Sequence, residues 1–225
     1  MREHEIDIDG LRTRVIGAPE AGQTMVLLMH GYDMKPEDLS PFAHSLGVPA
    51  LYLLPQAPHR TPTGYAWWDI DTAARTAALQ HGPRDLVEEI PPGLAPAREG
   101  LGEFIETARR RFSASGIILG GFSQGGMLAC DYLLHHPGSV GALILMSASR
   151  INFAAWQCHR SSLHDVPVFI SHGRADPDLA FAAGEQLRDF AAQSGAGITW
   201  VPFDQGHQIP LVVWRRLRKF ITASL

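Results

Sequence analysis

The sequence lacks the long apolar runs, the cysteine clusters and the basic excess that mark several large classes of protein. No segment approaches the roughly 18 consecutive apolar residues of a transmembrane helix, so we expect no stable membrane insertion. The two cysteines, Cys130 and Cys158, are too few for a disulfide framework and form no CxxC pair. The net charge is -4, and the only basic run, at 215–219, fits a solvated helix face, which argues against nucleic acid as a partner.

Signals for export, metal binding and phosphate binding are absent too. The first ten residues, MREHEIDIDG, are charged and contain no apolar signal-peptide core, so we expect a cytoplasmic location. The 11 histidines form neither HExxH nor another compact ligand set, which argues against a metal site. Residues 17–24, GAPEAGQT, have the outline of a phosphate-binding loop, but glutamine stands in the lysine position and a strand follows where a helix is required. We therefore expect no metal and no bound nucleotide.

The sequence does contain a regular series of short apolar runs, each long enough for one buried strand. They are MVLLM at 25–29, ALYLL at 50–54, IILGG at 117–121, ALILM at 142–146, PVFIS at 167–171 and ITWVPF at 198–203. The stretches between them place apolar residues at helical spacing, as in Leu101, Phe104, Ile105, Ala108 and Phe112. Near-continuous apolar strands that alternate with amphipathic helices predict a three-layer α/β fold, with a mostly parallel sheet and helices on both faces.

Two segments depart from this alternation. In the first 17 residues, apolar and polar residues alternate on both sides of Asp9 and Gly10, which predicts an antiparallel hairpin at the edge of the sheet. Residues 59–96 contain five prolines and no clear strand, and they are too long for an ordinary connection. We expect them to form an irregular insertion that shapes a pocket. No repeat or linker divides the chain, so residues 1–225 are expected to form one domain.

The stretch GFSQG at 121–125 contains the most informative residue of the chain, Ser123. It matches G-x-S-x-G between a predicted strand and a predicted helix, the setting in which the pattern marks a nucleophilic serine. A turn sharp enough to raise the serine above the sheet strains its backbone, and side chains two positions away would collide, so glycine is needed there. The serine also lies at a helix N-terminus, where free N–H groups favour a developing negative charge. The alternative is a glycine-rich helix start with a serine cap.

A serine nucleophile needs a base, and an acid that orients the base, in the chain order Ser, Asp, His. Asp176 lies in the sequence HGRADP, just after the strand predicted at 167–171, and His207 lies in DQGHQIP, just after the strand predicted at 198–203. Sites in open parallel sheets form beyond the carboxyl ends of the strands, so we expect these side chains to meet there. His207 is then the base for Ser123, and Asp176 fixes its tautomer and stabilises its charged form.

Other histidines and acids fit these roles less well. His135 and His136 follow the serine by about three helical turns and are expected to point away from it. His172 precedes its turn and is expected to be packed into the turn or bonded to it. Asp178 and Asp204 lie near the same turns, so the sequence leaves them as alternatives for the acid.

A tetrahedral intermediate needs two N–H donors for its oxyanion, each worth about 3 to 4 kcal/mol in the transition state. We expect one to be the backbone N–H of Gln124, at the start of the helix that follows the serine. The other is expected in the loop after the first apolar strand, which reads His30-Gly31-Tyr32, and we assign it to the Tyr32 amide. His30 itself is expected to be structural.

With these residues identified, the chain resembles the carboxylesterase and acyl-protein thioesterase family of the α/β-hydrolases. The resemblance runs from about residue 25 to 220 and is most specific in IILGGFSQGG, HG at 30–31, AWWD at 66–69, HGRADP, and Gly206-His207. It implies a single-domain α/β-hydrolase fold and hydrolysis of carboxylic esters or thioesters without a cofactor. It also implies a nucleophile, its partners and oxyanion donors at Ser123, Asp176, His207, Tyr32 and Gln124.

The chain departs from the family at the presumed acyl entrance. The loop after Gly31 reads Tyr-Asp-Met where family members commonly have Leu-Gly-Asp, so the entrance is expected to have its own shape. Trp68 and Trp67 lie in the long irregular segment, and together with Met34 they are expected to line an apolar acyl pocket.

The sequence thus predicts a serine carboxylesterase that cleaves short- to medium-chain esters through an acyl-enzyme. A thioesterase or lysophospholipase with the same triad is the alternative among enzymes. From another class, the alternative is a hydrolase-fold protein that binds a ligand without turning it over. The expected partner is a small-molecule ester or thioester, and the sequence leaves the oligomeric state open, a homodimer included.

Overall fold

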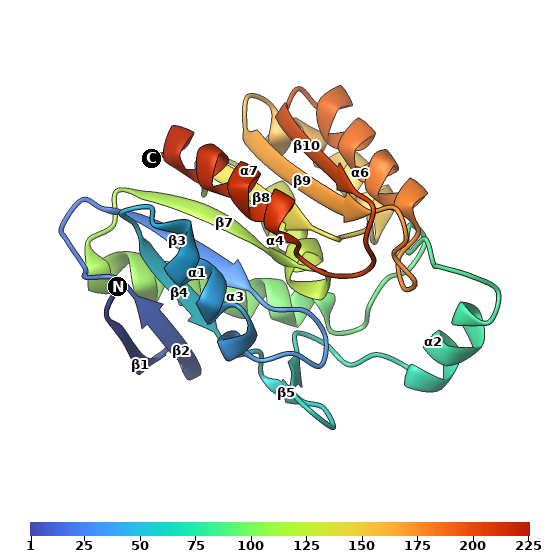
Figure 1. The fold of residues 1–225 in the computed structure, drawn as a ribbon, viewed down its shortest axis with the longest axis horizontal. Helices are drawn as coiled ribbons and strands as arrows, with labels where there is room; N and C mark the ends of the chain where they lie inside the picture. The colour runs from blue at the N-terminus through green and yellow to red at the C-terminus, as the bar shows by residue number, and fades with distance from the viewer.

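The computed structural model describes all of residues 1–225 and has an eight-stranded sheet at its centre (Figure 1). The strands lie in the order β1-β2-β4-β3-β7-β8-β9-β10. Their bounds are Glu3–Ile8 (β1), Leu11–Ile16 (β2), Thr24–Met29 (β3), Leu51–Pro55 (β4), Gly116–Phe122 (β7), Ala142–Met146 (β8), Pro167–Gly173 (β9) and Gly197–Phe203 (β10). From β4 to β10 every neighbouring pair is parallel, whereas β1 pairs antiparallel with β2 and β2 antiparallel with β4. The predicted sheet is confirmed.

The central strands are buried on both faces, which explains their unbroken apolar runs. In β3, Met25, Leu27 and Met29 contribute to one hydrophobic cluster, and Val26 and Leu28 contribute to a second cluster on the other side. Successive side chains of a strand point to opposite faces, so both faces must be apolar where both are covered.

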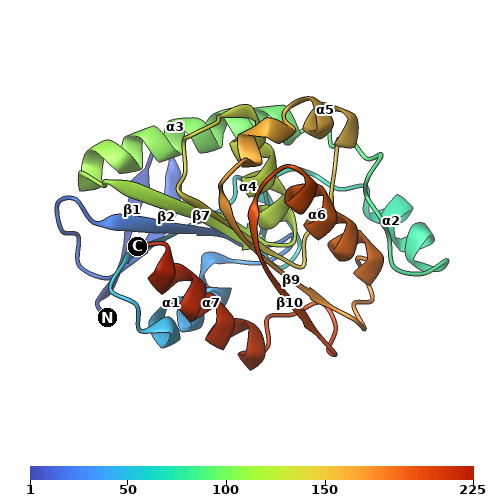
Figure 2. The same ribbon diagram turned by 90° about the horizontal axis from the view of Figure 1, so that it is seen from above.

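Helices cover both faces, as predicted. The larger hydrophobic cluster includes residues of α3 (Leu94–Phe112), α4 (Gln124–His135), α5 (Phe153–Cys158), α6 (Phe181–Gln193) and the 3-10 helix η2 (Arg160–Leu163). The smaller cluster includes residues of α1 (Ser40–Leu46) and α7 (Leu211–Ala223), and the 3-10 helix η1 (Pro36–Asp38) precedes α1. Figure 2 shows α3, α4 and α5 above the sheet and α1 and α7 below it. The architecture is therefore the three-layer α/β fold expected from the sequence.

The N-terminal hairpin lies at the sheet edge, as expected. Strands β1 and β2 pair from Glu3 opposite Ile16 to Ile8 opposite Leu11. The two residues that join them, Asp9 and Gly10, have φ angles of 52° and 76°. A two-residue hairpin turn with both φ angles positive matches the twist of the strands, and Asp-Gly is a favoured sequence for it.

The prediction that residues 59–96 are irregular is wrong in part. The segment contains a small two-stranded sheet, β5 (His59–Arg60) with β6 (Tyr65–Ala66), and the helix α2 (Thr72–Leu79). No residue of α2 is buried, so the helix leaves no apolar stripe in the sequence. Its first turn is capped by Asp71, whose carboxylate accepts the Ala74 N–H at 2.9 Å. In Figure 1, α2 stands clear of the sheet at one end of the molecule.

The helix α3 also begins earlier than the apolar spacing predicts. Its stripe was expected from Leu101, whereas the helix starts at Leu94 and includes Pro96. Proline is tolerated in the first turn because the N–H groups there have no helical acceptor to lose. The insertion therefore ends where α3 begins, at Leu94, earlier than the predicted end at residue 96.

Candidate active site

Ser123 stands in a strained turn between β7 and α4. Its φ is 52° and its ψ is -117°, a backbone conformation that residues other than glycine rarely adopt. A Cβ on Gly121 would lie 2.5 Å from the Met29 carbonyl oxygen, and one on Gly125 would lie inside contact distance of the same backbone. The two glycines of G-x-S-x-G are therefore required by close backbone approach. The turn is held by the Ser123 N–H, which donates to the Met146 carbonyl at 2.8 Å.

The loop after β3 lies directly against the serine. A Cβ on Gly31 would be 3.3 Å from the Cβ of Ser123, so only a residue without a side chain allows this approach easily. The next residue, Tyr32, lines the same cavity as Ser123 and Gln124, and its N–H donates to no protein carbonyl. Gln124 is the first residue of α4, where N–H groups have no helical acceptor. Tyr32 and Gln124 therefore each have a backbone N–H without a protein acceptor, and both residues line the cavity with Ser123.

Asp33 anchors this loop. Its φ is 59°. Its carboxylate accepts the Thr61 hydroxyl at 2.5 Å, the Thr63 hydroxyl at 2.7 Å and the Thr63 N–H at 3.0 Å. The hydrogen bond from Thr61, followed by those from Thr63, lowers the pKa of Asp33 below its ordinary value despite the opposing effect of burial. Asp33 therefore fastens the loop after β3 to the turn between β5 and β6.

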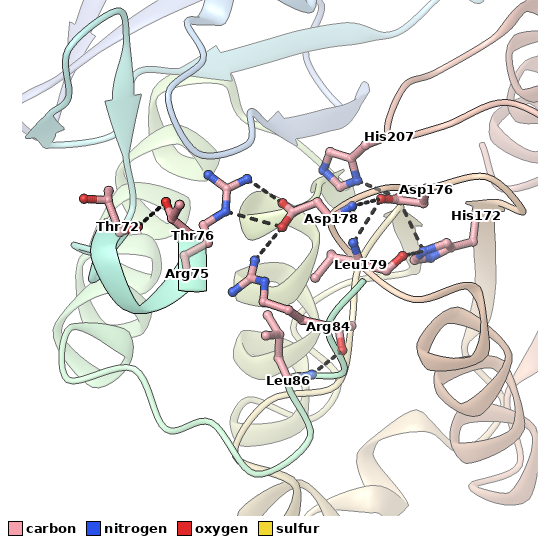
Figure 3. A network of polar contacts seen from close by, with 11 residues as sticks. Thr72, Arg75, Thr76, Arg84, Leu86, His172, Asp176, Asp178, Leu179 and His207 are labelled. Carbon is pink, nitrogen blue, oxygen red and sulfur yellow. Dashed lines mark hydrogen bonds and ion pairs between the residues drawn. The ribbon is translucent and has the colours of Figure 1, made fainter. Parts of the chain in front are cut away.

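Asp176 and His207 are brought together beyond the ends of β9 and β10. The Nδ1 of His207 lies 2.6 Å from Oδ2 of Asp176, as Figure 3 shows. A carboxylate accepts hydrogen bonds, so Nδ1 carries the proton and the neutral ring keeps its lone pair at Nε2. The two loops can meet because Gly173 has no side chain: a Cβ there would collide with the carbonyl oxygens of Gln205 and Gly206.

The surroundings of Asp176 keep it ionised. Its other oxygen, Oδ1, accepts the N–H groups of Asp178 at 2.9 Å and Leu179 at 3.0 Å. Burial acts to raise the pKa of Asp176, but the hydrogen bond and charge of His207 and these two N–H groups outweigh it and lower the pKa below its ordinary value. An aspartate in this state is suited to fix and stabilise an imidazolium.

The structure contains no hydrogen bond between the Ser123 hydroxyl and His207. The imidazole of His207 packs on Phe122, the residue before the serine, with 4.7 Å between ring centroids. The ring therefore lies against the residue that precedes Ser123, with its Asp176 bond already formed. Hydrogen bonds of catalytic groups commonly tighten only when a reaction partner binds.

The competing histidines form no comparable pair with the acid, although Nε2 of His172 lies 3.5 Å from Oδ2 of Asp176 (Figure 3). His172 is buried, and its Nε2 lies 3.1 Å from the Leu179 carbonyl oxygen, a distance at which it donates a hydrogen bond. Its Nδ1 is buried without a partner, and burial lowers the pKa of His172 below its ordinary value, so the ring is neutral. His135 and His136 pair with carbonyls of their own helix, near the end of α4.

The competing acids are also engaged elsewhere. The side chain of Asp204 is 94% exposed and lies 3.6 Å from Arg174. Asp178 pairs with Arg75 and Arg84, each at 2.7 Å. Asp176 is therefore the acid that bonds to His207.

A narrow cavity opens beside the serine. Its lining is formed by Tyr32, Trp68, Ile70, Arg75, Arg84, Leu86, Glu89, Pro91, Ser123, Gln124, Met127, Ile151, Asp178 and Leu179. Trp68 is among these residues, and it is held by Gln124, whose side chain donates to the Trp68 carbonyl at 2.9 Å. The free volume is about 40 Å³. This is room for about three water molecules.

Trp67 and Met34 do not line this cavity, contrary to expectation. The indole N–H of Trp67 donates to the His30 carbonyl at 2.9 Å, and the ring belongs to the larger hydrophobic cluster. A buried indole needs a hydrogen-bond partner, and the His30 carbonyl supplies it here. Met34 packs against the second cluster and pairs with Tyr65 by a single β-bridge.

The structure also brings charged residues to the cavity that the sequence analysis did not identify. Arg75 belongs to α2, and Arg84 follows it within the insertion. The carboxylate that they share, Asp178, is 103 and 94 residues away in the chain, so no local pattern connects them. The structure has no group of three or more His, Cys, Asp or Glu side chains arranged to hold a metal ion. None of its helices is long and apolar enough to span a bilayer.

Comparison with known proteins agrees with this geometry. The sequence profile described as Phospholipase/Carboxylesterase matches residues 12–225. Acyl-protein thioesterase 1 of Neurospora crassa is 27% identical over 116 residues, which cover 50% of this chain and 47% of that protein. The match therefore spans about half the length of this curated relative.

Solved structures share the fold. The esterase PE8 superposes with a TM-score of 0.77 at 23% identity, covering 94% of this chain and 97% of PE8. Acyl-protein thioesterase 2 of Zea mays superposes with a TM-score of 0.74 at 18% identity, covering 95% of this chain and 98% of the maize protein. The resemblance inferred from the motifs is thereby confirmed, and the chain belongs to the phospholipase/carboxylesterase family of the α/β-hydrolases.

Proposed function

We propose that the protein is a serine carboxylesterase that hydrolyses short- to medium-chain esters through an acyl-enzyme. The observation that carries the proposal is the 2.6 Å contact between His207 and Asp176, formed next to a serine at positive φ. Strain of this kind persists only where the surrounding structure enforces it, and it is common at catalytic residues. Family membership supports the same reaction class.

In the first half of the reaction, His207 removes the proton of Ser123 through Nε2 as the serine oxygen attacks the ester carbonyl. The carbonyl oxygen becomes an oxyanion, which accepts hydrogen bonds from the N–H groups of Tyr32 and Gln124. Each such donor is worth about 3 to 4 kcal/mol in the transition state. Asp176 stabilises the imidazolium that forms.

The tetrahedral intermediate then collapses. The bond to the alcohol oxygen breaks, and His207 donates its proton to that oxygen, leaving the acyl group on Ser123. A water molecule, deprotonated by His207, attacks the acyl carbonyl in the second half. Collapse of the second intermediate returns the proton to Ser123 and releases the acid.

The cavity favours the shorter acyl chains. Trp68, Met127 and Leu179 line the cavity with apolar side chains that suit an alkyl chain attached to the serine, but the free volume is about 40 Å³. A long alkyl chain fits only if the insertion moves. A chain-length series of 4-nitrophenyl esters tests this, and we expect kcat/KM to be highest at short chains and to fall beyond medium length.

A thioesterase is the second candidate, because the curated relative of Neurospora crassa is named an acyl-protein thioesterase. The same triad and the same oxyanion donors serve a thiolate leaving group. Matched butyryl esters and butyryl thioesters, measured under one condition, separate the two reactions. A kcat/KM at least tenfold higher for the ester supports the carboxylesterase, and the reverse ratio supports the thioesterase.

A further inference from the structure

The cavity beside Ser123 contains more positive charge than an apolar acyl pocket requires. Two arginines, Arg75 and Arg84, line it together with the serine. They approach one carboxylate, Asp178, from two sides (Figure 3). The two arginines belong to the insertion, whereas Asp178 follows β9 by a few residues. This cluster of three charged side chains therefore forms only in the folded protein.

The pairing geometry leaves guanidinium donors unused. Arg75 donates to Asp178 through Nε at 3.3 Å and through Nη2 at 2.7 Å. Arg84 donates to it through Nη2 alone, at 2.7 Å. The Nε of Arg84 is buried and has no hydrogen-bond partner. A guanidinium has five N–H donors in a planar fork that matches a carboxylate, and a buried donor left unpaired is costly.

The charges around the cavity do not cancel in its interior. Arg84 and Asp178 are largely buried, with 13% and 14% of their side chains exposed, and Arg75 is 30% exposed. The remaining charged residue of the lining is Glu89, which is exposed and makes no ion pair, so solvent screens its charge. Two cations therefore face one buried anion beside the nucleophile.

Holding Asp178 in place does not account for both arginines. The Asp178 N–H bonds to Asp176, so an anchored Asp178 helps to position the catalytic acid. One bidentate arginine, Arg75, suffices for that anchor. The second arginine adds a largely buried positive charge that a purely structural pair would not need, since burying an uncompensated charge is unfavourable.

We propose that Arg75 and Arg84 recognise a carboxylate at the far end of the substrate's acyl chain. The substrate class is then a short acyl ester that ends in a carboxylate, a monoester of a dicarboxylic acid. This inference rests on the proposed ester hydrolysis and specifies its substrate. The assignment to the acyl side follows from the narrow cavity, which holds the group that stays bound to Ser123 while the alcohol leaves.

The test compares two esters of equal shape and different charge. The anionic ester is mono-4-nitrophenyl glutarate, and the neutral isostere is 4-nitrophenyl 5-methylhexanoate. We expect the ratio of kcat/KM, anionic over neutral, to be at least ten in the unmodified protein. Arg84→Gln and Arg75→Gln are each expected to lower that ratio at least fivefold, and Asp178→Asn is expected to raise it, because it frees both guanidinium groups.

Arg150→Gln is the matched control. Arg150 is also an arginine with a largely buried side chain, 12% exposed, but it does not line the cavity. Its substitution is expected to leave the ratio within twofold. 4-Carboxyphenyl butyrate, compared with phenyl butyrate, carries the charge on the alcohol side instead, and we expect no preference for it.

Three results would overturn the proposal. A ratio near one in the unmodified protein excludes recognition of the carboxylate, and an equal loss of both activities in all three variants shows that the arginines only hold the loop. A preference confined to 4-carboxyphenyl butyrate overturns the acyl-side assignment.

A failure of the proposed function is recognised separately, because then neither ester is hydrolysed. In that case, calorimetric titration of Ser123→Ala with glutarate still decides the arginine assignment. Glutarate binding to Ser123→Ala that weakens at least tenfold in the Ser123→Ala, Arg84→Gln double variant supports the arginine assignment. Absence of glutarate binding to Ser123→Ala contradicts it.

Discussion

The Nδ1 atom of His207 lies 2.6 Å from the Oδ2 atom of Asp176, although 31 residues separate them in the chain. The contact forms because β9 and β10 are adjacent and parallel, so the loops after them leave the same edge of the sheet. Gly173 allows the two loops to touch. This relationship fixes the imidazole tautomer on which the proposed reaction depends.

Asp176→Asn is expected to reduce kcat of ester hydrolysis by roughly 10³ to 10⁴-fold. The asparagine amide no longer requires a proton on Nδ1 of His207, and it does not stabilise the imidazolium. Steady-state hydrolysis of 4-nitrophenyl butyrate measures the effect. Asp204→Asn is the control, since this side chain is 94% exposed, and it should retain at least half of the activity. Equal activities of the two variants would remove Asp176 from the proposed triad.

Gly125→Ala is expected to lower both stability and activity. A Cβ at this position meets the backbone of Met29 and His30, which cannot move without shifting the turn of Ser123. We expect a loss of at least about 2 kcal/mol in the free energy of unfolding, in the range of overpacked cores. Urea denaturation measures it.

The control for that variant is Gly100→Ala. Gly100 lies within α3, and a Cβ there meets nothing within 4 Å. Alanine has a higher helix propensity than glycine, so this variant should gain about 0.5 to 1 kcal/mol of stability. If both variants shift stability in the same direction, the steric explanation of the glycine pattern is wrong.

Stability should decrease as the pH falls below neutrality, because buried histidines must take up protons. Burial lowers the pKa values of His30 and His172 below their ordinary value. Between that ordinary value, about 6.5, and the lowered folded values, the unfolded chain binds more protons than the folded one. The free energy of unfolding therefore falls with decreasing pH, by at most about 1.4 kcal/mol per pH unit for each histidine, and levels off below the folded pKa values.

Denaturation at pH 7.5 and at pH 5.5 checks this effect in the unmodified protein and in His172→Gln. The variant lacks one titrating group and should show a smaller difference between the two pH values. His164→Gln is the control, because the side chain of His164 is 69% exposed, and it should keep the full difference. An unchanged pH difference in His172→Gln would contradict the assignment of a buried neutral ring.

The features that could be predicted from the sequence are those fixed by local patterns. Strand β8 was predicted with its observed bounds, 142–146, because every one of its residues is buried and apolar. Ser123 was identified because its turn requires glycines at fixed positions. Asp176 and His207 followed from the rule that sites form beyond the ends of parallel strands.

The remaining features depend on contacts that the sequence does not encode locally. Helix α2 has no buried face and therefore no apolar period. Trp67 was expected at the pocket, but its orientation is decided by a hydrogen bond to His30. Arg75 and Arg84 reach the cavity through Asp178, about 100 residues further along the chain. Such contacts become visible only in three dimensions.

The central claim is that Ser123 is the nucleophile, and peptide mapping after reaction with a fluorophosphonate tests it most directly. The probe forms a stable phosphonyl ester with an activated serine. The account predicts one adduct per chain, on the peptide that contains Ser123, and none in Ser123→Ala or in unfolded protein. An unlabelled protein, or an adduct on another residue that persists in Ser123→Ala, would contradict it.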